Sequence, residues 1–272
     1  MERTIPSVVW IHGWGQSPRV WDQSYRWLPD ARHSLFTYAD CDSVGQMRSR
    51  LHQTVSGLTG PVYVIGWSLG GMLALDTVLD SWEAGLRAAP NPGDFHCRIE
   101  RLVLVGATLR FVAEDRASGW PERLVRRMRS QLADKPRETL RKFAESMFSE
   151  RERRNREVVV ARMSAAGADT DFTQRGLDAG LAYLAETDLT QRWQSFIRSR
   201  ETGGEDQSGK ARIATPPIMW LHGEEDPICP AGALQDIPAS MKVLFPGAGH
   251  APFWTEPDRF AEQLRRIAHE HQ

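Results

Sequence analysis

The stretch Gly66-Trp67-Ser68-Leu69-Gly70 decides how this sequence folds. It follows the apolar run 62–65 and precedes residues 71–75, which favour helix. A serine between glycines at a strand-to-helix turn is typical of a nucleophile elbow, because the tight turn leaves no room for side chains beside the serine. The helix directs its first N–H groups and its positive dipole end toward the same point. The sequence therefore predicts that Ser68 is a nucleophile, the alternative being a chance match in a strand–helix turn.

Short apolar runs recur along the chain and alternate with stretches that favour helix. The runs that we expect to be strands are 7–11, 35–38, 62–65, 102–105, 217–221 and 241–245. The expected helices are 45–58, 69–88, 232–237 and 256–270. Nearly continuous apolar strands are typical of a sheet covered on both faces, and alternating β and α elements predict parallel pairing. The expected fold class is therefore α/β with a mostly parallel sheet.

Residues 112–200 interrupt this alternation. They contain no convincing strand and are rich in Arg, Glu, Ala and Leu, which favour helix. We interpret them as a helical cap inserted between the fourth and fifth strands, so that residues 1–111 and 201–272 form the core. The polar, glycine-rich stretch 201–210 is expected to be a mobile loop that returns the chain to the sheet.

The composition limits the classes of function. The chain has 272 residues, 41% hydrophobic and 25% charged, which suits one α/β unit with an insertion. A formal net charge of −1 argues against whole-protein affinity for nucleic acid or an anionic membrane. No apolar run approaches the ~18–20 residues of a membrane span. The cysteines Cys41, Cys97 and Cys229 have unrelated spacings, which predicts free thiols and a reducing compartment. We therefore expect a cytoplasmic protein, and a monomer.

A serine hydroxyl is a weak nucleophile and needs a base that an acid orients. In the fold that uses such an elbow, the acid and then the base follow the serine along the chain. Here the fifth expected strand leads into HGEED and the sixth into GAGH, both past carboxyl ends of strands, where open parallel sheets place their sites. We assign His250 as the base and Asp226 as its carboxylate. Glu224 and Glu225 compete with Asp226, and we interpret His222, at the strand–loop transition, as structural.

Two backbone N–H groups are expected to form an oxyanion hole. One belongs to Leu69, which follows the nucleophile. The second comes from the loop HGWG at residues 12–15, where Trp14 is the natural donor. The alternative for this loop is a plain turn at the end of a strand.

Four segments together resemble the α/β-hydrolase superfamily of serine hydrolases: IHGWG (11–15), GWSLGG (66–71), HGEEDPICP (222–230) and GAGHAPF (247–253). More narrowly, they resemble the pimeloyl-acyl-carrier-protein methyl ester carboxylesterases of biotin synthesis, with tryptophans at 14 and 67 and Ala-Pro-Phe after the histidine. The stretches 176–178 and 184–189 are similar to the segment that closes the cap in that family. The resemblance covers most of the chain from residue 8, and its GxxDP spacing favours Asp226 as the acid.

The sequence departs from the family pattern in two places. Only about seven residues precede the HGW strand, where the family usually has an antiparallel hairpin, so we expect about six strands. Extra sequence also lies near residues 82–98. Neither departure touches the expected triad.

The resemblance implies a serine carboxylesterase that cleaves the methyl ester of pimeloyl-acyl carrier protein and releases methanol. The carrier is acidic, so its partner needs a basic surface. Residues 110–163 hold 15 Lys and Arg against nine Asp and Glu. We expect carrier contact through Arg123, Arg126, Arg127, Arg137, Arg141 and Lys142. The alternative is a solvated helix face with i,i+4 pairs to Glu138, Glu145 and Glu152.

An aromatic channel under the cap would suit a linear acyl chain, because aromatic walls bury much area with little loss of conformational freedom. The candidates are Trp14, Trp67, Trp120, Phe143 and Phe253, and their alternative is ordinary core packing.

Two rival functions remain open from the sequence. One is a broad-specificity carboxylesterase, lactonase or C–C hydrolase that acts on a free small molecule, because fold does not determine substrate. The other is a noncatalytic binding protein with a hydrolase fold. We expect no metal or nucleotide cofactor, because the sequence has neither a ligand cluster with zinc spacing nor a P-loop.

Overall fold

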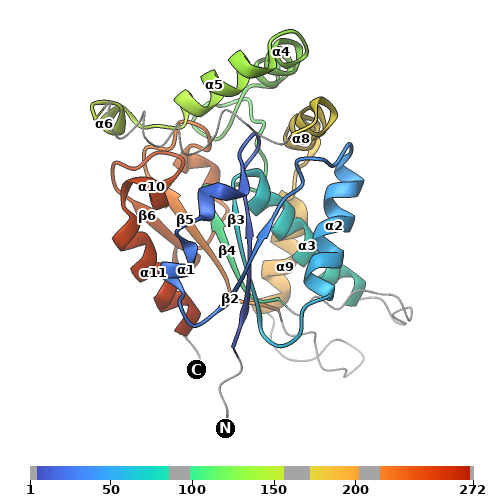
Figure 1. The fold of residues 1–272 in the computed structure, drawn as a ribbon, viewed down its shortest axis with the longest axis vertical. Coiled ribbons are helices and arrows are strands. Elements are labelled where there is room, and N and C mark those ends of the chain that lie inside the picture. Colours follow the sequence, from blue (N-terminus) through green and yellow to red (C-terminus); the bar gives the residue numbers. More distant parts are fainter. Residues whose placement is uncertain (1–4, 86–98, 156–171, 202–214, 270–272) are drawn as a thin grey trace.

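A six-stranded sheet forms the centre of the computed structural model, which describes residues 5–85, 99–155, 172–201 and 215–269. The strand order is β2-β1-β3-β4-β5-β6, and every neighbouring pair is parallel (Figure 1). The strands are β1 Ser7–Ile11, β2 Arg32–Phe36, β3 Val62–Trp67, β4 Ile99–Val105, β5 Ile218–Gly223 and β6 Lys242–Phe245. The expected α/β class and the count of about six strands are thus confirmed. Cys97 and most of the stretches 82–98 and 201–210 lie outside the described residues.

The central strands are the ones that the apolar runs predict best. Every side chain of β1 and β3 is buried, as expected for strands covered on both faces. The edge strand β2 begins three residues before the expected run 35–38, because its pairing with β1 starts at the polar residue Arg32. An edge strand can carry polar side chains, so its hydrophobicity marks only part of its length.

Helices cover both faces of the sheet (Figure 1). On one face lie α2 Val44–Ser56, α3 Leu69–Gly85 and α9 Thr190–Glu201, and on the other lie α1 Ser24–Trp27, α10 Pro252–Thr255 and α11 Pro257–His269. The helix expected over 232–237 is only a short 3-10 turn, Ala231–Leu234, in a stretch bracketed by Pro230 and Pro238. Two further 3-10 turns are Pro18–Trp21 and Ala239–Met241. No helix in the described ranges is long and apolar enough to cross a membrane.

The cap lies over the carboxyl ends of the strands (Figure 1). Its described helices are α4 Glu122–Asp134, α5 Pro136–Ser146, α6 Glu150–Arg153 and α8 Gln174–Glu186. Each of the two longest helices of the first half, α4 and α5, buries a narrow apolar stripe, which includes Val125 and Phe143, and turns charged residues to solvent. The helical character expected for this region therefore has a local cause, its 3.6-residue hydrophobic period.

The chain enters and leaves the cap at one point. The N–H of Leu189 donates to the carbonyl of Leu109 at 2.9 Å, and Arg110 and Asp188 form an isolated antiparallel bridge beside it. Helix α9 follows this point and packs on the core, where the ring centroid of Trp193 lies 5.0 Å from that of Trp220. We therefore propose that the cap ends near residue 188 and not at the expected residue 200, because α9 belongs to the layer beside the sheet.

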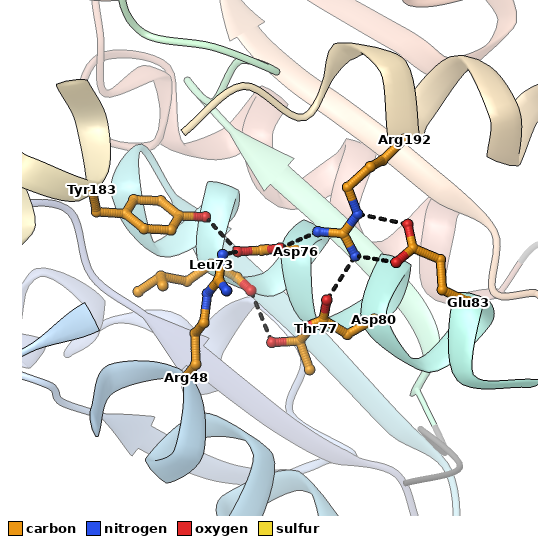
Figure 2. Close-up of polar contacts among 8 residues, drawn as sticks. All are labelled: Arg48, Leu73, Asp76, Thr77, Asp80, Glu83, Tyr183 and Arg192. Carbon is orange, nitrogen blue, oxygen red and sulfur yellow. Dashed lines mark hydrogen bonds and ion pairs between the residues drawn. The ribbon is translucent and has the colours of Figure 1, made fainter. Parts of the chain in front are cut away.

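A buried carboxylate joins three helices on one face of the sheet to the cap helix α8 (Figure 2). Asp76 of α3 is fully buried and accepts hydrogen bonds from Arg48 of α2, from Arg192 of α9 at 2.6 Å and from the hydroxyl of Tyr183 of α8 at 3.1 Å. Although burial alone would lower the pKa of Arg192, hydrogen bonds to Glu83 and Asp80 raise it above its ordinary value. The cap helix α8 is thereby attached to the helix that follows Ser68.

Replacement of Asp76 by alanine is expected to lower the free energy of unfolding by about 1.5–3 kcal/mol, because the buried hydroxyl of Tyr183 loses its acceptor and two arginines each lose a charged partner. Urea unfolding followed by circular dichroism measures this loss. Asp80→Ala is the matched control. Its side chain is 53% exposed and accepts a hydrogen bond from Arg192, so the loss should stay below about 1 kcal/mol. Equal losses for the two variants would contradict a central role of Asp76.

Candidate active site

Ser68 sits in a backbone conformation that the two flanking glycines permit. Its φ is 56°, and it is the only non-glycine among the described residues with a positive φ, a state that costs on the order of 1–3 kcal/mol. A Cβ at Gly66 would lie 2.6 Å from the carbonyl oxygen of Gly70, and a Cβ at Gly70 would lie 2.5 Å from that of His12. The chain can therefore bend this sharply only with glycine at both positions. The turn leads directly into α3, as the elbow motif predicts.

The loop after β1 lies against the serine. A Cβ at Gly13 would be 3.3 Å from the Cβ of Ser68. The indole N–H of Trp14 donates to the carbonyl of Leu177 in α8 at 2.9 Å, so the cap holds this loop. Leu69 is the first residue of α3, and its N–H is among the helix donors that have no acceptor within the helix. Of the two expected oxyanion donors, Leu69 thus follows the serine directly, and Trp14 belongs to the loop that lies against it.

His250 and Asp226 form a buried pair. The ring Nδ1 of His250 lies 2.7 Å from Asp226 Oδ2, and both side chains are fully buried. Because a carboxylate only accepts, Nδ1 carries the proton and donates it. Asp226 Oδ1 accepts the backbone N–H groups of Ile228 at 2.8 Å and Cys229 at 2.9 Å, which hold the carboxylate in place. Nε2 of His250 is buried and has no hydrogen-bond partner among the described residues, so it is free to take a proton.

The other candidates for the acid and the base, Glu224, Glu225 and His222, have different surroundings. Glu224 and Glu225 are exposed, whereas Asp226 is buried against the histidine. His222 Nε2 donates to the carbonyl of Cys229 at 2.7 Å and lies 3.6 Å from Asp226 Oδ2. Burial lowers the pKa of His222, so the ring is neutral at pH 7. These contacts support Asp226 as the acid and a structural role for His222.

One group of side chains has the donor types that a metal ion needs. Ligand atoms of Asp226, Cys229 and His250 lie within 4.8 Å of one another. Burial and the neighbouring Asp226 raise the pKa of the Cys229 thiol well above its ordinary value, which keeps it protonated. A protonated thiol is a poor metal ligand, and the Asp226–His250 hydrogen bond already occupies the other two groups.

Three of the five aromatic candidates gather between the core and the cap. The ring of Phe143 in α5 meets Trp14 edge-on at 4.9 Å and lies 6.5 Å from Trp120. Trp14 and Phe143 are buried, and Trp120 is partly exposed.

The other two candidates lie beneath the histidine. Trp67 donates its indole N–H to the carbonyl oxygen of His250 at 2.8 Å, and its ring meets Phe253 edge-on at 5.2 Å. Phe253 packs 4.5 Å from Trp21 in the core. No ring contact among the described residues joins this group to the first one. The five aromatics thus form two separate groups.

The six basic candidates on α4 and α5 are all exposed. Arg126, Arg141 and Lys142 form ion pairs with glutamates of their own helices, at i,i+4 spacing, as the alternative interpretation anticipated. The remaining three, Arg123, Arg127 and Arg137, form no ion pair with a described residue.

The sequence did not point to two parts of the site. One is the segment 147–152 of the cap, which is hydrogen-bonded to the loop that carries His250; a capping box at Ser149 and Glu152 was its only visible signal. The other is Asp76, an acidic residue inside an apolar helix. Its burial could be anticipated, but its partners could not, because they lie on three other helices.

Known proteins resemble this chain over most of its length. Residues 8–263 match the Alpha/beta hydrolase family. A pimeloyl-[acyl-carrier protein] methyl ester esterase from Nitrosomonas europaea is 29% identical over 94% of this chain and 92% of its own length. A protein of the same name from Aromatoleum aromaticum is 27% identical over 96% of this chain and 98% of its own length.

Solved structures share the fold. An esterase from Exiguobacterium antarcticum has a TM-score of 0.68 at 19% identity and covers 98% of this chain and 93% of its own. A bromoperoxidase from Bacillus anthracis has a TM-score of 0.70 at 19% identity, with 97% and 92% covered. At this identity the likeness concerns the fold alone.

Asp226→Asn is expected to slow the labelling of Ser68 by a fluorophosphonate about 10³–10⁴-fold, because an amide favours the wrong tautomer of His250. Mass spectrometry of the intact protein gives the rate constant. Glu224→Gln and Glu225→Gln, at the exposed neighbouring positions, are matched controls that should label at the wild-type rate. A rate for Asp226→Asn within a few fold of wild type would sink the assignment of this carboxylate.

His12, in the loop beside Ser68, makes stability depend on pH. Burial lowers its pKa to about 4, against an ordinary value of 6.5. Between pH 6.5 and 4 the unfolded chain binds the proton more readily, so stability falls as the pH drops, by about 2 kcal/mol at pH 5 relative to pH 7. Urea unfolding at a series of pH values measures this slope. His12→Gln should flatten it, although His222 contributes in the same direction; a variant with the full wild-type slope would show that His12 is not its source.

Proposed function

Because this chain belongs to the Alpha/beta hydrolase family, we propose that it is a carboxylic ester hydrolase that removes the methyl ester of pimeloyl-acyl carrier protein in biotin synthesis. The observation that carries the proposal is the buried 2.7 Å hydrogen bond between His250 and Asp226, which leaves Nε2 of the histidine free. The names of the relatives, which align over more than nine-tenths of this chain, support the substrate.

Acylation begins at Ser68. Its hydroxyl oxygen attacks the carbonyl carbon of the ester while Nε2 of His250 takes the hydroxyl proton. The imidazolium that forms is stabilised by Asp226, whose second oxygen stays occupied by two backbone N–H groups. The carboxylate therefore cannot rotate away as the histidine becomes charged.

The negative charge of the tetrahedral intermediate falls on the former carbonyl oxygen. The N–H groups of Trp14 and Leu69 stabilise it, and the loss of one such donor typically costs about 10²–10³ in rate. The intermediate collapses, and His250 returns its proton to the methoxy oxygen, which leaves as methanol. A water molecule, deprotonated by the same histidine, then cleaves the acyl-enzyme and restores Ser68.

The cap supplies the binding surface in this proposal. Trp14, Phe143 and Trp120 line the channel for the acyl chain, because they lie between the core and the cap. Trp67 and Phe253 support the histidine loop instead. With the cap at residues 112–188, Trp120 and Phe143 belong to the cap, and Trp14 belongs to the loop that the cap holds.

The carrier would meet the exposed face of α4 and α5. Three exposed cations there form no ion pair with any residue that the structure describes, and their charge is available for an acidic partner: Arg123, Arg127 and Arg137. Arg126, Arg141 and Lys142 contribute less in this scheme, because glutamates of the same helices already neutralise them. We also propose that the enzyme works as a cytoplasmic monomer, with Cys41 and Cys229 as buried free thiols.

The purified protein is expected to hydrolyse methyl pimeloyl-acyl carrier protein, and Ser68→Ala should abolish this activity. The triple variant Arg123→Glu, Arg127→Glu, Arg137→Glu should lower kcat/KM for the carrier-bound ester at least about tenfold, because like charges repel at the docking surface. Methanol release and the rate on p-nitrophenyl butyrate give the two readouts. The latter should stay within about twofold, since a free ester needs no carrier surface.

Arg19→Glu, Arg26→Glu, Arg32→Glu is the matched control, since these exposed arginines lie outside the cap and give the same change in net charge. This control should hydrolyse both substrates at the wild-type rate. Equal losses on both substrates in the cap variant would argue for a broad-specificity esterase that acts on free small molecules. Retention of hydrolysis in Ser68→Ala would overturn the nucleophile itself.

A further inference from the structure

The cap is bonded directly to the loop that carries the proposed base. The N–H of His250 donates to the carbonyl of Met147 at 2.8 Å, and the hydroxyl of Ser149 donates to the carbonyl of Gly247, also at 2.8 Å. Met147 and Ser149 are both buried. The main chain before His250 is thus held by a segment that lies about 100 residues earlier in the sequence.

Glu152 completes this contact. One of its carboxylate oxygens accepts the N–H of Ser149 at 2.8 Å, which closes the capping box of α6, and the other accepts the N–H of Gly249 at 2.9 Å. The same side chain therefore bonds to the cap and to the residue next to His250. A hydrogen bond to an ionised acceptor is roughly twice as strong as one between neutral groups.

The fit at this contact is close. A Cβ at Gly249 would lie 2.5 Å from the carbonyl oxygen of Met147 and 2.6 Å from Glu152 Oε2. Glycine is thus required here so that the histidine loop can approach the cap segment within hydrogen-bonding distance. The approach places the carboxylate one peptide unit from the base.

We propose that Glu152 is a positioning residue for His250, which it holds through the N–H of Gly249 so that the base is in place only while α6 is docked on the loop. This inference rests on the proposed function of His250. The N–H of His250 is held by the carbonyl of Met147, and its carbonyl is held by the indole of Trp67. Neither bond reaches the preceding peptide, whose carbonyl at Ala248 accepts the N–H of Glu225 at 3.1 Å. Glu152 holds the other side of that peptide, the N–H of Gly249.

Such a role affects chemistry more than binding. A shift of the base by about 1 Å can cost about 10²-fold in rate. The proposed acyl channel of Trp14, Phe143 and Trp120 does not include this carboxylate. Loss of Glu152 should therefore lower kcat and leave KM nearly unchanged. A glutamine at this position keeps an oxygen that can accept from Gly249, but its amide N–H₂ cannot accept from Ser149.

The test measures kcat and KM of Glu152→Ala and Glu152→Gln in the full chain on p-nitrophenyl butyrate. The concentration of active enzyme is taken from complete labelling by a fluorophosphonate. We expect kcat to fall about 10–100-fold in Glu152→Ala, with KM within twofold and slower labelling that still reaches completion. Glu152→Gln should recover a large part of kcat. Glu150→Ala is the matched control, because Glu150 is an exposed residue of the same helix, and it should behave as wild type.

Thermal unfolding shows whether a lower kcat comes from a misplaced base or from a partly unfolded protein. A Glu152→Ala variant that is fully folded and fully labelled at the assay temperature, yet has wild-type kcat, would overturn the proposal. So would a loss of kcat that disappears after correction for the labelled fraction, or a glutamine variant no better than the alanine variant. If Ser68→Ala kept full activity, the proposed function would fail first, which distinguishes that failure from the failure of Glu152 alone.

Discussion

The bend at Ser68 constrains the rest of this structure. The serine adopts a φ of 56° between a buried strand and a long helix, and the backbone of its turn approaches the loop after β1 so closely that no Cβ fits at Gly70. Such a conformation persists only when its surroundings hold it. Here the N–H of Ser68 donates to the carbonyl of Val105 in β4, so pairing within the sheet itself holds the serine at the carboxyl edge.

The other proposed catalytic groups lie on loops that follow the neighbouring strands. Asp226 follows β5 and His250 follows β6, and their 2.7 Å hydrogen bond joins the two loops in a fully buried position. The cap adds support from above: α8 holds the loop of Trp14, and Ser149 and Glu152 hold the loop of His250. The cap therefore has two structural connections to the site in addition to covering it.

Sequence patterns anticipated those features that depend on neighbours along the chain. The sharp turn at Ser68 and the presence of six strands follow from local motifs and apolar runs, although β2 and β4 each begin three residues before the expected run. The strand β2 was placed too late because its polar start is visible only in its pairing with β1. The five aromatic candidates looked equivalent in the sequence, yet Trp67 bonds to His250 while Trp14 bonds to the cap.

By itself, the sequence determined the α/β class, the six parallel strands and the chemical types available at the carboxyl edge, because strand periodicity and turn glycines act over a few residues. The tertiary structure alone decided that Met147, Ser149 and Glu152 hold the loop of His250, and that Asp76 connects the cap helix α8 to the core. These outcomes depend on contacts between residues up to about a hundred positions apart, and only the packing of one element on another brings such residues together.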